Sequence, residues 1–599
     1  IMYLATDQGS RLSIDGGKTW LSHNNMAIGQ YYAIGVDMRD PYYVAGGLQD
    51  NGLWITPSNS REFRGILNMH SSWIAEGDGF HTQIDPDDWK TVYTVNHVGF
   101  VARQNIETRE YTFITPTPET ITNFTDFVEY DYDETRNRYT IDPGEHWFFR
   151  ERPDRPLLPP QFRFNWSSPF IISSNNSKRV FFGSNHLFQS DDRGDNWKII
   201  SPDLTTNDKN LRNTSNGGGL TNSNTGGENH FTIITISDTP IDKDIIWIGT
   251  DDGNVQITKD NGDNWENIRL NINDVPLKTW VSRVEASKHK KGRAYVTFDN
   301  HRFDDNKPYV FMTDDYGKTW ENITSNLPLD YSVYVIKEDY IDKNLLFVGT
   351  EKSVYFSINQ GKSWEKLGSN LPSVAVHDLV IHPRDGDLIA GTHGKSIWIL
   401  DDISALRNLN LKSSSILPIK TSTKWITINT GRKQPYFEFR GENPPYGAII
   451  NFFGNRSEKG KLIISNDLES NFYNKEINIS DGINRFLWPF ILDRNSKELE
   501  NYKRKFIDLV DEFSDIVLNK KNLKSYDFQK LNSFEEVNKL RKKFLDEFGM
   551  YANGKNIFGE KVYQTYDIKP GKYKIKIELE SGESFTDTII VRDDPIKSN

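Results

Sequence analysis

Acidic side chains in irregular, glycine-rich segments are the residues of this chain best suited to chemistry. They are Asp50 in LQDNG, Glu76 and Asp78 in AEGDG, Glu228 in GGENH, and Asp299 close to His301 and Arg302. A glycosidase needs two carboxylates flanking the scissile bond, about 5–5.5 Å apart for retention and about 6.5–9.5 Å for inversion. The five acids are therefore candidate catalytic residues, and His301 and Arg302 are candidate binding residues.

The same acids have an ordinary structural explanation, because turn capping and salt bridges use the same residue types. With 83 Asp and Glu residues in the chain, some acids always resemble catalytic ones. No Phe-Arg-Ile-Pro element of the sialidase kind occurs, and cysteine is absent altogether. No His-x-x-x-His pair is placed for zinc, and the Asp-rich turns lack the final Glu of a calcium hand. We expect neither a metal nor a cofactor.

Five short segments with one shared pattern indicate the elements that position these residues. The pattern is S/T-x-D-x-G-x-x-W, with Asn in place of Asp in the last copy. The copies are SIDGGKTW (13–20), SDDRGDNW (190–197), TKDNGDNW (258–265), TDDYGKTW (313–320) and SINQGKSW (357–364). The last four follow one another at or somewhat above the roughly 40 to 50 residues of a propeller blade. The longer first gap has room for degenerate blades.

Each copy predicts a hairpin turn. Asp or Asn can accept hydrogen bonds from backbone N–H groups two residues on, and the Gly supplies a positive φ. The Ser or Thr ends one strand, and the Trp begins the next and can wedge between neighbouring sheets. We therefore assign a structural role to the third and last residues of each copy, which are Asp15, Trp20, Asp192, Trp197, Asp260, Trp265, Asp315, Trp320, Asn359 and Trp364.

Apolar strands that end in a Gly turn recur between these copies and complete the predicted architecture. Examples are IIWIGT (245–250), LLFVGT (345–350), LIAGT (388–392) and YYVAGG (42–47). Together with the boxes they predict an all-β fold, a propeller of about seven blades over residues 1–410. Residues 107–160 depart from the pattern and read as an insertion. Long insertions in a compact fold often carry function.

The region 411–599 predicts a second domain. Strands are expected at 425–428, 448–453, 461–464, 573–579 and 586–591, which together suit a small β-sandwich. Between them, apolar residues at helical spacing over about 496–550 predict a helical hairpin, with Ser533 and Glu536 as the capping box of its second helix.

Overall charge and hydropathy exclude several partners. The formal net charge is −11, without a basic stripe that could neutralise phosphates, which argues against nucleic acid and an anionic membrane surface. No apolar stretch of about 18 residues is present, so no spanning helix is expected. The chain opens as a strand already under way, from which we expect N-terminal blades to be missing.

The boxes, together with the run Val376–Asp385 and the motif Gly391–Gly394, resemble the sortilin N-terminal propeller family. The resemblance is to its large bacterial, glycosyl hydrolase-like members, in which an Ig-like domain follows the propeller. NPPYG (443–447) and GINRFLW (482–488) extend it into the C-terminal region. It implies an extracytoplasmic protein, secreted, periplasmic or at the cell surface. The receptor role of the eukaryotic members does not transfer, because their cysteine-rich module has no counterpart here.

Three functions remain open. The leading hypothesis is a recognition protein whose propeller binds a peptide, protein or polysaccharide ligand, with the β-sandwich as a spacer or docking unit. The second is an endo-acting glycoside hydrolase of the xyloglucanase type, for which two face-exposed carboxylates at glycosidase spacing would be needed. The third is a structural subunit of an envelope assembly, which a mass measurement in solution would reveal as a stable complex.

Overall fold

A computed structural model describes most of the chain. It covers residues 1–6, 9–23, 26–124, 132–133, 138–139, 162–208, 230–368, 370–428, 439–465, 471–490 and 568–595, with a few separate positions between 503 and 540. The chain divides into two compact units. The first comprises residues 1–60, 64–403 and 432–442, and the second residues 61–63, 404–431 and 443–599.

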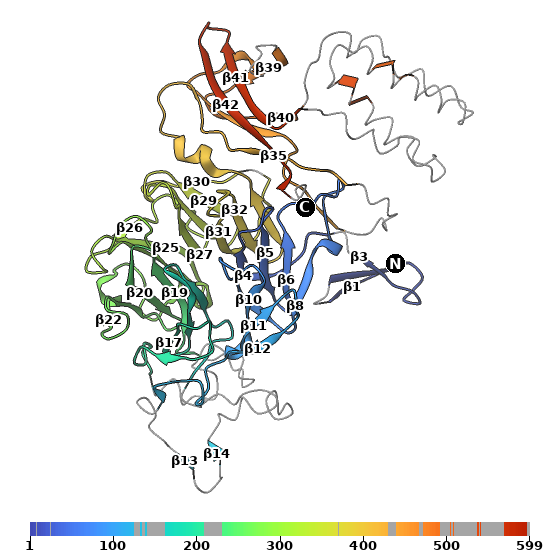
Figure 1. Ribbon diagram of the computed structural model, residues 1–599. Coiled ribbons are helices and arrows are strands. Elements are labelled where there is room, and N and C mark those ends of the chain that lie inside the picture. The colour runs from blue at the N-terminus through green and yellow to red at the C-terminus, as the bar shows by residue number, and fades with distance from the viewer. Residues whose placement is uncertain are drawn as a thin grey trace. The chain divides into compact units, whose positions relative to one another are not determined.

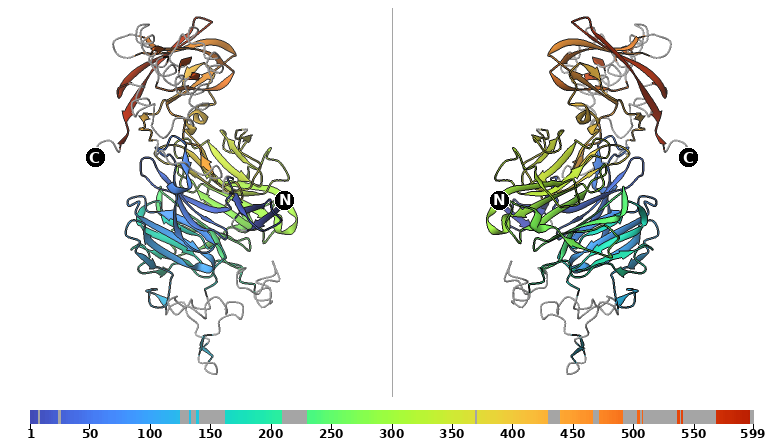
Figure 2. Two further views of the ribbon diagram at one scale, coloured as in Figure 1. Left: turned by 90° about the vertical axis from the view of Figure 1, so that its right-hand side faces the viewer. Right: turned by 90° about the vertical axis from the view of Figure 1, so that its left-hand side faces the viewer.

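Seven antiparallel sheets form the first unit's ring in the described residues, and they confirm the predicted propeller (Figure 1, Figure 2). Blade 1 consists of β4 (Tyr31–Val36), β5 (Tyr43–Leu48), β6 (Gly52–Pro57) and β8 (Ser72–Ala75). Blade 2 consists of β9 (Gly79–Ile84), β10 (Thr91–Asn96), β11 (Val101–Asn105) and β12 (Tyr111–Phe113). Blade 3 consists of β15 (Phe170–Ser173), β16 (Asn176–Gly183), β17 (Leu187–Ser190) and β18 (Lys198–Ile199).

The remaining four blades follow in chain order. Blade 4 consists of β19 (Ile233–Thr239), β20 (Asp242–Thr250), β21 (Val255–Thr258) and β22 (Glu266–Asn267), and blade 5 of β23 (Trp280–Ala286), β24 (Ala294–Asn300), β25 (Asp305–Thr313) and β26 (Glu321–Asn322). Blade 6 consists of β27 (Val333–Glu338), β28 (Leu346–Thr350), β29 (Val354–Ser357) and β30 (Glu365–Lys366). Blade 7 consists of β31 (Val376–Ile381), β32 (Leu388–Thr392) and β33 (Ile397–Leu400).

The first strand of each blade is its inner strand, and consecutive inner strands are neighbours. The ring closes where β31 of blade 7 lies beside β4 of blade 1. A bridge between Gln30 and His393 marks this closure. The buried carboxylate of Asp378 adds to it by accepting a hydrogen bond from the Ile34 N–H at 3.0 Å. Blades 7 and 1 thus meet through contacts between their inner strands. In the described residues, neither of the two sheets contains a strand from the other blade.

The recurring glycine before the end of the second strand is explained by close packing between blades, not by a turn. A Cβ on Gly249 would lie 2.4 Å from Val281 Cγ1 of the next blade, and one on Gly47 would lie 2.2 Å from the backbone of Gly79. Gly349 meets Val376 in the same way. The GT and GG motifs therefore mark where each inner strand presses on the preceding blade.

The box turns join the third and fourth strands of blades 3 to 6. In the first of these, the Ser190 hydroxyl donates to Asp192 Oδ1 at 2.7 Å and accepts from the Gly194 N–H at 2.8 Å. Asp192 Oδ1 also accepts from the Asn196 N–H at 2.9 Å. The Asp192 carboxylate therefore accepts from the N–H four residues later in the chain, whereas the sequence pattern predicted an N–H two residues later. The residue before the glycine, Arg193, is also left-handed with φ 64°.

The box tryptophans differ in what they contact. The indole Nε1–H of Trp197, Trp265 and Trp364 donates to a carbonyl of the preceding blade, at Ile114, Ile200 and Ile323 respectively. The indole Nε1–H groups of Trp320 and Trp20 donate to a glycine of their own turn.

Box 13–20 lies outside the ring, in a separate sheet of β1 (Met2–Thr6), β2 (Gly9–Ser13) and β3 (Leu21–His23).

Short elements complete the first unit. Most of the predicted 107–160 insertion lies outside the described residues, but β12 falls within it as the fourth strand of blade 2. The smaller elements are β7 (Ile66–Leu67) paired with β36 (Arg440–Gly441), β13 (Tyr132–Asp133) paired with β14 (Arg138–Tyr139), and the 3-10 helices η1 (Asn68–His70), η2 (His97–Gly99), η5 (Arg269–Asn271) and η6 (His301–Phe303).

The second unit contains two sheets around one apolar core, which includes Trp488, Ile450 and Ile575. One sheet is β34 (Ser415–Ile416), β37 (Ala448–Gly454) and β40 (Gly482–Trp488). The other is β35 (Ser422–Lys424), β42 (Ser584–Asp593), β41 (Gly571–Leu579), β38 (Glu458–Ser465) and β39 (Asn471–Ile479), and the 3-10 helix η7 (Ile403–Asn408) begins at the end of the first unit.

Two expectations for this region need comment. The strand expected at 425–428 is wrong, because β35 ends at Lys424, the Ile426 N–H donates to the carboxylate of Asp594, and Ile428 forms an isolated bridge with Glu62. The predicted helical hairpin at about 496–550 lies outside the described residues, apart from a few separate helical positions.

Candidate functional site

The inner strands all begin at one face of the propeller, and β-bulges set the side chains there. Register shifts place Tyr32 of β4, Tyr334 of β27 and His377 of β31 at a bulge near the start of their strands. A bulge redirects a side chain out of the regular alternation. Three adjacent blades, 6, 7 and 1, thus present a ring side chain at equivalent positions of this face, which we call the collar face.

The second strands of the same blades end at the collar face and supply a partner for each ring. Gln49, Glu351 and His393 each donate a backbone N–H to the carbonyl two residues before the bulge. The Tyr32 hydroxyl then donates to Gln49 Oε1 at 2.8 Å, and the Tyr334 hydroxyl donates to Glu351. His377 stacks on His393, with ring centroids 4.2 Å apart and an interplanar angle of 6°.

Ring side chains of the other blades also lie at or near the collar face, although Phe80 and His97 of blade 2 are buried. Tyr334 lies 4.6 Å from His377, and Tyr32 lies 5.1 Å from His393 and 4.6 Å from Phe80, between ring centroids. We call the set the collar, and its members are Tyr32, Phe80, His97, Trp166, His230, Trp280, His301, Tyr334, His377 and His393. A set of rings from separate blades at one face is the kind of surface that binds ligands.

Charged groups join the collar at blade 5. The Asp299 carboxylate lies 2.6 Å from His301 Nδ1 and 3.3 Å from an Arg302 nitrogen. The Arg302 guanidinium in turn lies over the ring of Trp280, 4.0 Å from its centroid. Burial alone would raise the pKa of Asp299, but His301 and Arg302 outweigh it and lower the pKa. Asp299 is therefore held as a paired anion.

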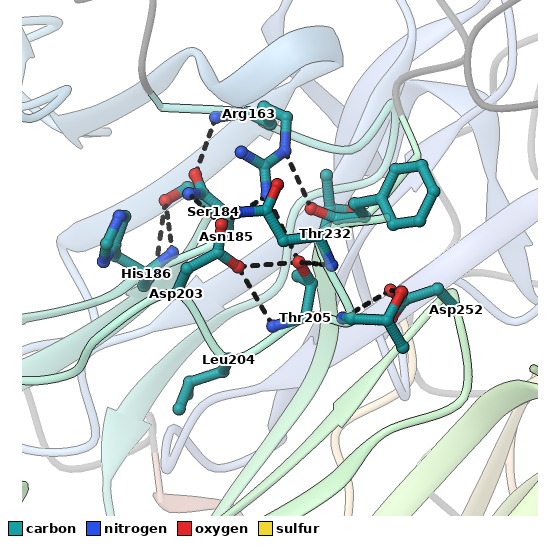
Figure 3. A network of polar contacts seen from close by, with 12 residues as sticks. Arg163, Ser184, Asn185, His186, Asp203, Leu204, Thr205, Thr232 and Asp252 are labelled. Atoms are coloured by element: carbon teal, nitrogen blue, oxygen red, sulfur yellow. Dashed lines mark hydrogen bonds and ion pairs between the residues drawn. The ribbon is translucent and has the colours of Figure 1, made fainter. Parts of the chain in front are cut away.

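A polar network holds blades 3 and 4 together beside the collar (Figure 3). The Arg163 guanidinium donates to Asp203 Oδ2 at 2.7 Å and to the Phe231 carbonyl at 3.2 Å, while the Arg163 N–H donates to Asn185. The Thr205 hydroxyl donates to the other oxygen of Asp203 at 2.6 Å. Burial would raise the pKa of Asp203, but Arg163 and Thr205 together lower it. The network fixes the backbone before β15 and after β18.

An ion pair crosses the inside of the ring below the collar. Arg283 of blade 5 reaches blade 7, where a guanidinium nitrogen lies 3.2 Å from Asp378 Oδ1 and donates to the His377 carbonyl. Since Asp378 also accepts from Ile34 of blade 1, one carboxylate ties three blades. A ligand at the collar face therefore meets a charged pair beneath it.

Three imidazoles at the collar face, His377, His81 and His393, are held neutral. Burial, with the neighbouring His393 second, lowers the pKa of His377 from 6.5 to about 3. Burial, with Arg283 second, lowers the pKa of His81 to about 4. Burial also lowers the pKa of His393. His377, His81 and His393 are thus uncharged near neutral pH.

The low pKa of His377 predicts a loss of stability in acid. Between pH 6.5 and about 3 the unfolded chain binds a proton at this site that the folded chain does not, so lowering the pH through this window favours unfolding. The slope is at most about 1.4 kcal/mol per pH unit, and less because the ring keeps partial exposure. Thermal midpoints of the wild type should fall more steeply than those of His377→Gln between pH 7 and 5. Parallel curves would contradict this.

The predicted site residues are only partly brought together. Asp299, His301 and Arg302 form one cluster, as described above. Asp50 and Asp78 form another, since the Asp50 N–H donates to Asp78 Oδ1 at 2.6 Å. Burial and the adjacent Asp78 raise the pKa of Asp50. Glu76 is exposed, and its backbone carbonyl accepts from the Asn96 amide. Glu228 lies outside the described residues.

Reasoning from sequence missed the collar itself. A signal was present, because Tyr32 and Gln49 are 17 residues apart, and Tyr334 and Glu351 have the same spacing. In each pair the second residue follows a recurring Gly-Leu or Gly-Thr. Aligning the blades on that glycine would have found these positions.

The described residues include no helix long and apolar enough to span a membrane.

Known proteins resemble this chain in part. Residues 308–487, from within β25 to within β40, match the family model described as Sortilin-Vps10, sortilin, neurotensin receptor 3. No curated protein sequence matches. Among solved structures, a GH74 enzyme from Niastella koreensis is similar at 13% identity and a TM-score of 0.39, covering 72% of this chain and 65% of that one.

Two further solved structures are similar. One is YCF48 bound to D1 peptide, at 9% identity and a TM-score of 0.36, covering 63% of this chain and 94% of that one. The other is the extracellular domain of a hybrid two component system from B. thetaiotaomicron, at 11% identity and a TM-score of 0.37, covering 96% and 57%. At such identities and TM-scores, the ligands and substrates of these proteins do not carry over to this chain.

Proposed function

This chain carries a β-propeller of the sortilin-like family, and from that premise we propose that it is a recognition protein which binds a peptide or glycan ligand at the collar face. The single observation that supports this most is the collar, to which blade 1 and blades 3 to 7 contribute partly exposed ring side chains at one face. Partly exposed rings with hydrogen-bonding groups beside them bind ligands without needing to react with them.

A hydrolytic function is less well supported by the same face. The Asp78 carboxylate accepts the Asp50 backbone N–H at 2.6 Å, so it is engaged by the turn of blade 1. The carboxylate of Asp299 is engaged by His301 and Arg302. These contacts suit binding better than the paired acid and base of a glycosidase.

The setting that fits this proposal is extracytoplasmic. The family of the matched segment and the absence of cysteine from the whole sequence agree with a protein that works outside the cytoplasm without disulfides. We assign the β-sandwich unit the role of spacer or docking unit, as in secreted or surface proteins where a binding domain is held away from its anchor.

Replacing Tyr334 by Ala should weaken ligand binding by about tenfold, because it removes a ring of the collar and the hydroxyl that orients Glu351. The measurement is a screen of the purified chain against peptides and polysaccharides, recording both binding and product release, followed by titration of each ligand found. Tyr340→Ala is the matched control, since Tyr340 follows the other end of β27 and is 45% exposed.

Equal binding by both variants would place the ligand elsewhere and refute the collar as the site. Release of oligosaccharides that is lost on Asp50→Asn or Asp78→Asn would replace recognition by hydrolysis. Binding without turnover, weakened at Tyr334 alone, is the expected result.

A further inference from the structure

One arc of the collar combines tilted rings with carboxylates. It runs through blades 6, 7 and 1, from Tyr334 past His377 and His393 to Tyr32. The planes of Tyr334 and His377 are inclined by 47°, and those of Tyr32 and His393 by 56°. Rings inclined in this way do not form one flat platform. The faces of aromatic rings carry negative electrostatic potential, which attracts a cation placed against them.

Carboxylates border this arc on both sides. Glu351 accepts the Tyr334 hydroxyl and is exposed, so its remaining lone pairs face solvent. On the other side, Asp50 follows Gln49, which accepts the Tyr32 hydroxyl, and Asp78 accepts the Asp50 N–H. Burial first, and then the charges of Asp78 and Asp50, raise the pKa of the Tyr32 hydroxyl. In the described part of the chain, no basic side chain forms an ion pair with Glu351, Asp50 or Asp78. The arc is therefore a region of uncompensated negative charge.

Two arginines near the arc are already engaged. Arg302 lies over Trp280 and contacts Asp299, and Arg283 is paired with Asp378. The imidazoles of His377 and His393 are neutral, because burial lowers the pKa of both. Neither the arginines nor the histidines therefore supply the positive charge that Glu351, Asp50 and Asp78 would favour.

We propose that the arc formed by Tyr334, His377, His393 and Tyr32, with the carboxylates of Glu351, Asp50 and Asp78, binds the cationic side chain of a lysine or arginine in a peptide ligand. This inference rests on the proposed recognition function and names its ligand class. The cation lies against the rings of the arc, and the carboxylates accept charge-assisted hydrogen bonds from its N–H groups. A sugar would instead stack on a flat, exposed ring, and the inclined rings of the arc do not form one.

The test begins with a random peptide library selected on the full chain. Selected peptides should be enriched in Lys or Arg, and exchanging that residue for norleucine should weaken binding by about tenfold, since a hydrogen bond to a charged group is lost. Binding should also weaken with added salt. Glu351→Gln should remove most of the difference between the lysine and norleucine peptides. Glu321→Gln on the outer strand β26 removes the same charge and should leave the difference intact.

Tyr334→Phe separates positioning from direct contact. It keeps the ring but releases Glu351, so it should reduce the preference for lysine over norleucine without abolishing binding. Circular dichroism of each variant checks that the fold is retained.

The outcomes separate this inference from the function on which it rests. Peptides without a basic residue, or equal binding of the norleucine peptide, would overturn the cation site while Tyr334→Ala still weakens binding. Binding of polysaccharides alone at the collar would also overturn it and leave recognition standing. No ligand affected by any collar substitution would overturn both.

Discussion

Replacing Trp197 by Ala is expected to lower the free energy of unfolding by about 3–5 kcal/mol. The indole is 1% exposed and packs with Phe182 and Phe188 between blades 2 and 3. Its Nε1–H donates to the Ile114 carbonyl at 2.7 Å, so the substitution leaves both a cavity and an unsatisfied buried acceptor. Urea unfolding followed by far-ultraviolet circular dichroism measures the change without relying on tryptophan fluorescence.

Trp20 provides the matched control, because it occupies the same position of the same motif in a different environment. It is 36% exposed, belongs to the separate three-stranded sheet, and donates to Gly17 of its own turn. Trp20→Ala should change the midpoint far less than Trp197→Ala. Equal losses would mean that the box tryptophan stabilises only its own turn and that the contact with the preceding blade adds nothing.

Glu285→Gln is expected to cost about 1.5–3 kcal/mol, because it leaves the partly buried Lys288 and Lys337 without their counter-ion. Glu285 is buried on β23 and contacts Lys288, and its other oxygen lies 3.1 Å from Lys337 Nζ on β27 of the next blade. Burial would raise the pKa of Glu285, but the two lysines outweigh it and bring the pKa to about 2. The carboxylate therefore joins the inner strands of blades 5 and 6 as an anion.

The pH dependence of the contacts between Glu285, Lys288 and Lys337 follows from the lowered pKa of Glu285. The folded chain keeps Glu285 ionised below the pH at which the unfolded chain takes up a proton, so its contribution is present above about 4.5 and is lost as the pH falls toward 2. The difference between the wild type and Glu285→Gln should shrink over this range. Glu266→Gln, in an exposed pair with Lys259, should leave the unfolding midpoint almost unchanged. A persistent difference at low pH would contradict the assignment.

Part of the site could be predicted from the sequence, because its residues are neighbours along the chain. Asp299, His301 and Arg302 lie within one hairpin connection, and the structure brings them together. Asp50 and Asp78 were chosen separately, and their contact arises because the turn of blade 1 meets the connection into blade 2. Arg283 was not chosen, since nothing local reveals that it reaches across the ring to Asp378.

The sequence by itself determined the repeat, because each box forms its turn through hydrogen bonds within a few residues, as between Ser190, Asp192 and Gly194. Strand periodicity indicated the propeller for the same local reason, whereas the recurring glycines reflect close packing between blades. Only the tertiary structure decided where the collar lies. Tyr32, Tyr334 and His377 come from distant parts of the chain, and they meet because closure of the ring places β31 beside both β27 and β4. The contacts that define the site therefore depend on how the blades pack, a long-range property that no short stretch of sequence contains.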